Sequence, residues 1–274
     1  MTLPTDLVFV RHGQSEANVV QRAEKVAIRS GDAVVVPPGF YDRHDWQFRL
    51  SPLGREQAEV AGTFFDGGLG RHFDVGYVSP HMRARETAAL LGGSDFPWLI
   101  DDRLRERDWG VYGAVPRSER TELFPLTERQ QQNSPWYAHF DGGESLASGV
   151  FARVRDFLGT LHRERADQRV IAVTHGEFMW TARYVLERML PEEWEALDAD
   201  KSKRIRNCTI LEYTRRDPQT GDVQPTLQWR RLRYTDEPAR SPHGGEWVRL
   251  ATKRQFTGAQ LEELVQSVPP LELG

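Results

Sequence analysis

Short apolar runs alternate with longer segments of helical periodicity along most of this chain. Runs typical of strands lie at residues 7–10, 74–78, 97–100 and 170–173. Apolar side chains recur at helical spacing over residues 53–65, 83–91, 146–161 and 178–190. Short runs with little alternation are typical of strands buried on both faces of a parallel sheet. The pattern therefore predicts an α/β fold, a three-layer α/β/α sandwich around a mostly parallel sheet.

The ends of several elements carry their own signals. Ser51-Pro52 predicts a helix start, with serine as N-cap and proline in the first turn, and Gly67-Gly68 predicts its end. Residues 207–213 and 226–234 read as two strands around a turn, which predicts an antiparallel edge of the sheet. Thr257 and Gln260 form a capping box for a last helix.

Two long segments fall outside this alternation, at residues 19–49 and 114–143. Each follows the carboxyl end of a strand or a motif near one, which is the side where open α/β sheets bind ligands. Long loops at that side are commonly lids. We therefore expect one domain over residues 1–235, with these two insertions forming a lid over the active site. We expect residues 236–274 to be an extension that packs on the same domain.

Composition and charge narrow the possible partners. The chain has 36 basic and 40 acidic side chains and a formal net charge of −4, so we expect no nucleic acid partner. No apolar run is long enough to span a bilayer, and no secretion signal is visible, so we expect no membrane association. Cys208 is the only cysteine, which excludes an internal disulfide and favours a cytoplasmic protein.

Two of the strand-like runs end in a histidine and a glycine, within RHG at residues 11–13 and THG at residues 174–176. If these strands are neighbours, His12 and His175 leave the same edge of the sheet. The glycines that follow them, Gly13 and Gly176, would let the backbone approach a ligand closely.

Two arginines join this edge in the expected fold. Arg11 precedes His12, and Arg83 lies in the first turn of a helix that follows a third strand. Taken singly, Arg83 could be a solvated helix residue, Asn18 a turn or cap residue, and Glu106 a surface carboxylate. Together, two guanidinium forks, two imidazoles and a helix N-terminus favour a small dianion such as phosphate.

Four motifs in sequence order, RHGQSEAN, SPHMRARETA, LRERDWG and VTHGE, resemble those of the histidine phosphatase superfamily, which has the phosphoglycerate mutase-like fold. The resemblance spans residues 7–234. It implies that His12 is the nucleophile of a phosphohistidine mechanism and that Arg11, Arg83 and His175 bind the phosphoryl group. It also implies that Asn18 touches phosphate.

The resemblance places the general acid in the sequence Leu104-Arg105-Glu106, so we prefer Glu106, with Asp108 as the competitor in the same crowded cluster. As an acid, this carboxyl must hold a proton, which requires a raised pKa. The adjacent Arg105 and Arg107 would lower that pKa unless their side chains point away.

The family contains phosphatases, mutases and members that only bind. The sequence GGES at residues 142–145 resembles the phosphatase branch, and the arginine pair of cofactor-dependent mutases is absent. We therefore predict a phosphomonoester hydrolase. Phosphoglycerate mutase-type transfer and a non-catalytic phosphate-ester-binding module remain the alternatives. The arginines can do the work of a metal, so we expect no metal and no cofactor.

The substrate is less defined than the reaction. The two insertions are rich in aromatic side chains: Phe40, Tyr41, Trp46, Phe48, Phe124, Trp136, Tyr137 and Phe140. Such residues usually pack a segment onto the body of a protein. Alternatively, they form a wall for a bulky or aromatic phosphate ester. We expect a small phosphorylated metabolite as substrate and either a monomer or a homodimer.

Overall fold

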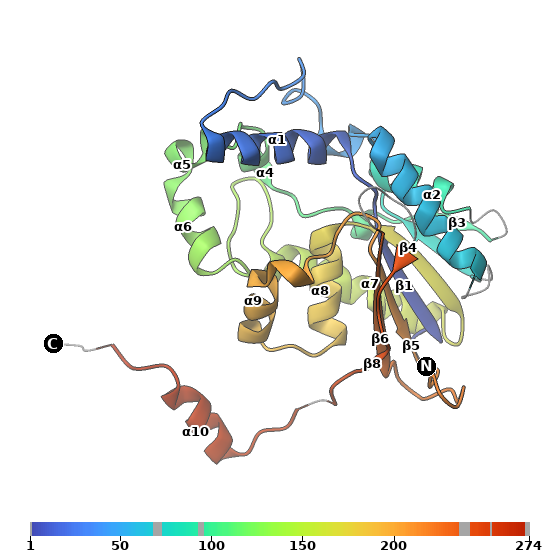
Figure 1. The fold of residues 1–274 in the computed structure, drawn as a ribbon. Coiled ribbons are helices and arrows are strands. Elements are labelled where there is room, and N and C mark those ends of the chain that lie inside the picture. The colour runs from blue at the N-terminus through green and yellow to red at the C-terminus, as the bar shows by residue number, and fades with distance from the viewer. Residues whose placement is uncertain (1, 68–72, 93–95, 236–241, 253, 272–274) are drawn as a thin grey trace.

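The computed structural model describes residues 2–67, 73–92, 96–235, 242–252 and 254–271. A mixed sheet forms its centre, with helices on both faces (Figure 1). The strands run in the order β3-β2-β4-β1-β5-β6-β7, and β8 pairs with β6. Their bounds are β1 (Asp6–Arg11), β2 (Val75–Val78), β3 (Trp98–Ile100), β4 (Arg169–Thr174), β5 (Ile210–Thr214), β6 (Trp229–Thr235), β7 (Pro242–His243) and β8 (Val248–Arg249).

Strand direction divides the sheet into two parts. β3, β2, β4 and β1 are parallel, whereas β5 runs antiparallel to β1 and β6 antiparallel to β5. This arrangement confirms the predicted α/β sandwich with an antiparallel edge. Both runs that end in histidine and glycine, β1 and β4, lie side by side in the middle of the sheet.

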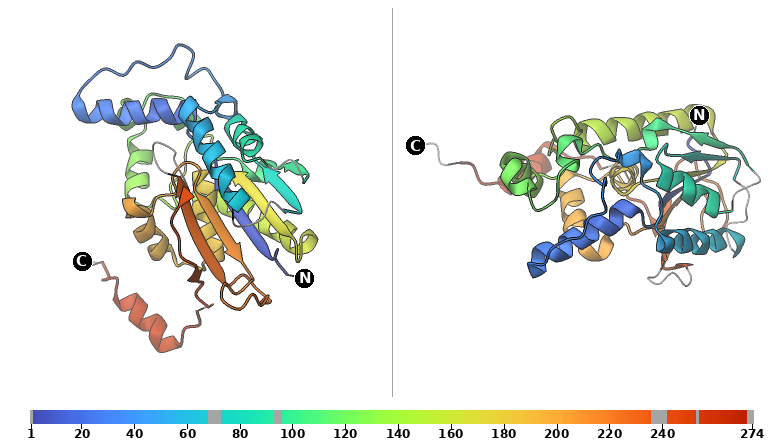
Figure 2. Two further views of the ribbon diagram at one scale, coloured as in Figure 1. Left: turned by 45° about the vertical axis from the view of Figure 1, so that its right-hand side comes forward. Right: turned by 90° about the horizontal axis from the view of Figure 1, so that it is seen from above.

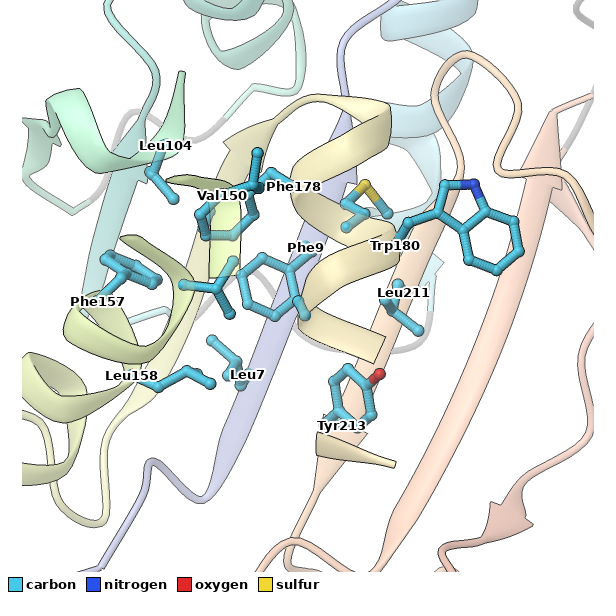
Figure 3. Packing of buried hydrophobic residues seen from close by; sticks show 14 of the residues in the cluster. Leu7, Phe9, Leu104, Val150, Phe157, Leu158, Phe178, Trp180, Leu211 and Tyr213 are labelled. Atoms are coloured by element: carbon cyan, nitrogen blue, oxygen red, sulfur yellow. The ribbon is translucent and has the colours of Figure 1, made fainter. Parts of the chain in front are cut away.

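Alternate residues of the central strands enter two separate cores. Leu7 and Phe9 of β1 pack under α7 (Phe151–Glu164) and α8 (Gly176–Leu186), where Figure 3 shows them beside Phe157 and Phe178. Val8 and Val10 face the other side, under α2 (Pro52–Gly67) and α3 (Met82–Leu90). Because helices cover both faces of the sheet, the residues on each face of β1 are apolar. The strand therefore appears in the sequence as an uninterrupted apolar run.

Most predicted helix boundaries agree with the structure. The hydroxyl of Ser51 accepts a bond from Gly54 N (3.1 Å) at the start of α2, which ends at Gly67; Gly68 lies outside the described residues. The long helix predicted from residue 146 instead opens with a π-helical turn, Leu146–Val150, before α7. A further helix, α9 (Pro191–Ala199), follows α8 and was not predicted. Among the described helices, none has the length and apolarity needed to cross a bilayer.

Much of the first insertion is helical, which corrects our interpretation of residues 19–49 as a weakly patterned loop. Helix α1 (Glu16–Ser30) starts with a capping box between Ser15 and Asn18 and ends at Gly31, whose φ is 78°. Its buried stripe is narrow because the helix projects from the sandwich, as Figures 1 and 2 show. A single 3₁₀ turn, Asp45–Gln47, lies near the end of the insertion.

The second insertion contains two short helices, α5 (Arg120–Leu123) and α6 (Pro125–Asn133), and α4 (Gly110–Gly113) immediately precedes it. It meets the first insertion at Glu24 of α1, whose carboxylate accepts bonds from the Tyr41 hydroxyl (2.5 Å) and from Arg117 N (3.1 Å). The two insertions therefore support each other through one buried acidic side chain.

The aromatic residues of the two insertions differ in how far their side chains are exposed to solvent. Phe48, Trp136 and Phe140 are 6%, 4% and 0% exposed, as expected of residues that fasten the insertions to the body. Trp46 and Tyr137 are 39% and 58% exposed. Phe40, Tyr41 and Phe124 are half-buried, so Trp46 and Tyr137 are the most exposed of these eight aromatic residues.

Beyond β6 the chain continues along the edge of the sheet. β8 pairs with β6, and Leu250 packs against the core under α7 and α8. Thr257 and Gln260 form the predicted capping box of α10 (Gly258–Gln266), whose residues are all exposed. Figure 1 shows α10 apart from the sandwich. Residues 236–241, at the predicted start of the extension, lie outside the described part of the chain.

The core under α7 supplies a stability prediction. Phe157 is fully buried, with its ring 5.2 Å from that of Tyr77 and 6.1 Å from that of Phe178. We expect Phe157→Ala to lower the free energy of unfolding by about 3–5 kcal/mol, because it leaves a cavity in a packed core. Urea denaturation measures this loss. Leu126→Ala, at a residue 71% exposed on α6, is the control; equal losses in both variants would contradict the described packing.

Candidate active site

The paired ends of β1 and β4 bring two imidazoles together. Arg11 lies opposite Thr174 in the parallel register, so the next residue of each strand leaves the sheet at the same point. The rings of His12 and His175 are 4.9 Å apart and nearly edge to face, and the two residues are 2% and 0% exposed. The structure therefore places both predicted histidines in one buried site.

Hydrogen bonds assign the proton of the His12 ring. Nδ1 lies 2.7 Å from the carbonyl oxygen of Gly13, which can only accept, so Nδ1 carries the hydrogen. Nε2 then holds a lone pair and accepts a bond from Arg83 Nε at 3.3 Å. Burial, and next the charges of Arg83 and Arg11, hold the pKa of His12 well below its usual value. The ring is neutral, with its unprotonated nitrogen facing a guanidinium.

Arg83 is a buried cation at the start of α3. It is 4% exposed, and its helix begins immediately after His81. While Nε meets His12, the two terminal nitrogens bind Asp45 of the first insertion, NH2 reaching Oδ2 at 2.8 Å. NH1 also donates to the Asp45 carbonyl oxygen at 2.7 Å. One guanidinium thus joins the imidazole of His12, just after β1, to an anion on the first insertion.

Two buried nitrogens of the site, one on Arg11 and one on His175, have no hydrogen-bond partner. Arg11 donates from NH1 to the carbonyl oxygen of Ile205 (2.8 Å), but its buried Nε has no hydrogen bond. His175 Nε2 bonds to the Ser79 hydroxyl (2.8 Å), and its buried Nδ1 is also unpaired. A Cβ on Gly176 would contact Arg11 Nε at 3.5 Å. Unsatisfied buried donors are costly, so they indicate where an anionic ligand would bind.

Glu106 is a carboxyl on which the charges of both Arg83 and Arg11 act. Its Oε1 accepts bonds from Arg107 N (3.0 Å) and Glu177 N (3.3 Å), and burial raises its pKa above the usual value against the opposing charges of Arg83 and Arg11. Asp108, the competing candidate, is exposed and accepts a bond from Gly110 N at 2.9 Å.

The arginines that flank Glu106 point away from it. Arg105 binds Asp102 at 2.6 Å. Arg107 bonds to the carbonyl oxygens of Glu144 and Ala138 and lies over the ring of Phe140 at 4.5 Å. These contacts hold both guanidinium groups away from the Glu106 carboxyl, and the largest charges that lower its pKa are those of Arg83 and Arg11.

Side chains from two other elements fix the backbone that carries Glu106. Thr174, at the end of β4, donates from its hydroxyl to the carbonyl oxygen of Leu104 at 2.7 Å. Arg153 of α7 donates to the carbonyl oxygens of Arg103 (2.7 Å) and Arg105 (3.1 Å) and pairs with Glu144. The GGES sequence at residues 142–145 thus supports the acidic loop through Glu144.

Two predicted ligand contacts look different in the structure. The side-chain oxygen of Asn18 accepts bonds from Ser15 N (3.2 Å) and from the Asn207 amide (3.1 Å). This oxygen therefore belongs to the N-terminal cap of α1. A Cβ on Gly13 would overlap the carbonyl oxygen of Gly54 in α2. Gly13 is therefore needed for the close approach of a helix, whereas we had expected it to make room for a ligand.

Three functional candidates were missed from the sequence. Asp45 lies in the first insertion, which we expected to cover the site, but nothing in the sequence singled out this residue. His81 packs 4.7 Å from His175, and burial lowers its pKa to about 4. Glu177 follows the THG sequence directly; burial, and next the charge of Glu106, raises its pKa to about 7. A carboxylate after a histidine-glycine strand end is the signal that could have identified it.

We found no group of three His, Cys, Asp or Glu side chains placed to hold a metal within the described parts of the chain. The cationic character of the site comes from Arg11 and Arg83. Both fit an anion better than a metal ion, which would be repelled by their charges.

Comparison with known proteins points to one family. The sequence model of the histidine phosphatase superfamily (branch 1) matches residues 38–223. Phosphoserine phosphatase 1 of Hydrogenobacter thermophilus is 31% identical over 170 residues, which cover 62% of this chain and 70% of that protein. A 2,3-bisphosphoglycerate-dependent phosphoglycerate mutase of Methylobacterium sp. is 29% identical over 202 residues, covering 70% and 85%.

Solved structures agree on the fold. The alpha-ribazole phosphatase of Shigella flexneri aligns with a TM-score of 0.59 at 20% identity, covering 81% of this chain and 96% of that one. A mycobacterial glucosyl-3-phosphoglycerate phosphatase aligns with a TM-score of 0.59 at 23% identity, covering 81% and 100%.

The raised pKa of Glu177 predicts a pH-dependent stability. Between 4.5, its ordinary value, and about 7, the folded state holds a proton that the unfolded state has lost. This contribution therefore favours folding at low pH and is lost as the pH rises through that window. We expect Glu177→Gln to gain on the order of 2 kcal/mol relative to wild type between pH 5 and pH 8. Urea denaturation at both pH values tests this, and parallel behaviour of the two proteins would contradict it.

Proposed function

The chain belongs to the histidine phosphatase superfamily, and from this we propose that it hydrolyses phosphomonoesters through a phosphohistidine on His12. One observation carries the proposal: a neutral imidazole whose lone pair at Nε2 faces the guanidinium of Arg83. An imidazole attacks phosphorus only when it is unprotonated and oriented; the bonds at Nδ1 and Nε2 support both conditions, and the bond from Arg83 opens as phosphorus approaches Nε2.

In the first step His12 Nε2 attacks the phosphorus, so that a P–N bond forms and the ester P–O bond breaks. Arg11, Arg83 and His175 stabilise the charge on the three equatorial oxygens, as phosphoryl transfer requires. The unpaired Nε of Arg11 is a donor available for this purpose, and Nδ1 of His175 is a second one in the tautomer whose Nε2 accepts from the Ser79 hydroxyl. Glu106 gives its proton to the leaving oxygen, so the alcohol departs neutral.

In the second step a water molecule attacks the phosphohistidine and the P–N bond breaks. Glu106, now ionised, accepts the proton of this water, and inorganic phosphate is released. Its raised pKa supports the first role, because a carboxyl with an ordinary pKa would already be ionised at neutral pH. The exposure of Asp108 supports our choice of Glu106 over it.

Relatives of this chain include both phosphatases and mutases, so the two activities must be separated. Phosphoserine phosphatase 1 is among the relatives with 31% identity, and residues 142–145 carry the GGES sequence of the phosphatase branch. A mutase must keep water from its phosphoenzyme, whereas a phosphatase admits it. These features favour hydrolysis. The alternative of a binding module loses weight because all five proposed catalytic residues are present.

We further propose that the substrate is a small phosphorylated metabolite in the cytoplasm and that the reaction needs no metal. The single cysteine, Cys208, is buried and free, which suits a reducing compartment. Trp46 and Tyr137 are the exposed aromatic residues of the insertions that could meet a bulky or aromatic leaving group.

Replacing His12 tests the nucleophile. We expect His12→Ala to lower kcat/KM for p-nitrophenyl phosphate by roughly 10⁴-fold, because no other group can form the covalent intermediate. Wild type should also trap a labelled phosphoryl group that acid releases, and EDTA should leave its activity intact. His162→Ala, at an exposed histidine of α7, is the matched control. Full activity in His12→Ala would refute the assignment, and inactivation by EDTA would refute the metal-free mechanism.

Substitution of the two carboxyls tests the acid. We expect Glu106→Gln to slow alkyl phosphates roughly 10²- to 10³-fold but p-nitrophenyl phosphate far less, because a good leaving group needs no proton. Asp108→Asn should leave both rates near wild type. Kinetics on a series of esters with graded leaving-group pKa measure this difference. The reverse pattern would transfer the role to Asp108.

A further inference from the structure

The cation beside His12 already holds an anion that belongs to the protein. Asp45, in the first insertion, is 38 residues from Arg83 in sequence, and its two carboxylate oxygens face the two terminal guanidinium nitrogens at 3.3 and 2.8 Å. His81 Nδ1 lies 3.4 Å from the same carboxylate. This paired geometry is how an arginine fork binds a carboxylate or a phosphate.

The position of this carboxylate matters because Arg83 has one guanidinium for two tasks. Its Nε contacts the lone pair of His12 (3.3 Å), and its two terminal nitrogens, the paired donors that best fit a phosphoryl group, are the ones that Asp45 occupies. Asp45 and a phosphate ester therefore compete for the same two donors. The carboxylate also contributes to the raised pKa of Glu106, which places it near the proposed acid.

The segment around Asp45 is fastened at both ends, and between them Arg43 forms an exposed ion pair with Glu16 at 3.2 Å. On one side the Tyr41 hydroxyl bonds to Glu24 at 2.5 Å. On the other, Phe48 is 6% exposed, and Arg49 pairs with Glu86 at 2.7 Å. Residues 42–47 between these anchors are exposed, and the Asp45 side chain itself is 49% exposed. A short tip of this kind can leave the guanidinium without disturbing the core.

We propose that Asp45 is an internal ligand of the phosphate-binding guanidinium, which fills the fork of Arg83 between turnovers and must yield to substrate and to product phosphate. The inference rests on the proposed function for the identity of the competing ligand. A phosphate dianion brings a second negative charge and a third oxygen, and it also reaches the unpaired donors of Arg11 and His175. The phosphate dianion therefore displaces the Asp45 carboxylate, and its net affinity is lower because the contacts of Asp45 with Arg83 are lost.

The consequence is weaker retention of product. Inorganic phosphate makes the same contacts with the fork as the phosphoryl group of the substrate, so a competing carboxylate lowers the affinity for both. Because Asp45 returns to the guanidinium when phosphate leaves, Arg83 is not left as an unpaired buried cation, whose cost would be large.

Calorimetric titration of inorganic phosphate at pH 8 tests the inference in the full-length protein. We expect Asp45→Asn to tighten the Kd for phosphate roughly three- to tenfold, a modest gain because the Asp45 side chain is half exposed and its backbone carbonyl contact remains. Asp42→Asn, at an exposed residue of the same tip, and Asp45→Glu should both bind phosphate as wild type does. The KM for p-nitrophenyl phosphate should fall in Asp45→Asn by the same factor as the Kd.

The outcomes separate this inference from the proposed function. Unchanged or weaker phosphate binding by Asp45→Asn, or an equal gain in Asp42→Asn, would overturn it. The absence of phosphate binding in all variants would overturn it as well. If phosphate binds and Asp45→Asn tightens it, but no ester is hydrolysed, then the internal ligand stands and the proposed hydrolase activity fails.

Discussion

The parallel pairing of β1 with β4 is the constraint on which the site depends. Its register sets Arg11 opposite Thr174, and the residues that follow, His12 and His175, therefore meet at one edge with their rings 4.9 Å apart. A slip of one residue would exchange the two faces of a strand and move apolar side chains out of their cores. The two cores that clamp the strands thus also fix the distance between the imidazoles.

Two guanidinium groups, those of Arg11 and Arg83, lie around this pair of histidines, while the imidazoles themselves stay neutral. Burial and the two guanidinium groups favour neutral imidazoles, while burial favours a protonated Glu106. These shifts move each group toward the protonation state that phosphoryl transfer needs. The arginines next to Glu106 are turned to other partners, Asp102 and the carbonyl oxygens of Glu144 and Ala138.

The sequence predicted the parts of this arrangement that are local or periodic. The strands, the α2 and α10 caps and the histidine-glycine ends follow from short-range patterns, and neighbouring parallel strands bring their ends together. Helix α1 was missed because it buries only a narrow stripe. Asp45 and Glu177 were missed for another reason: one reaches the site through a long insertion, and the role of the other depends on its distance from Glu106. Neither leaves a periodic signal.

The insertion also explains how so cationic a site can exist without a ligand. Arg83 is 4% exposed, and a guanidinium at that depth needs a partner in every state of the protein. His12 cannot serve, because it is neutral and offers only a lone pair. Asp45 supplies the missing negative charge from an exposed tip, so its release requires little of the fold to move. A carboxylate on a rigid, buried element would satisfy Arg83 equally well but would leave no room for phosphate.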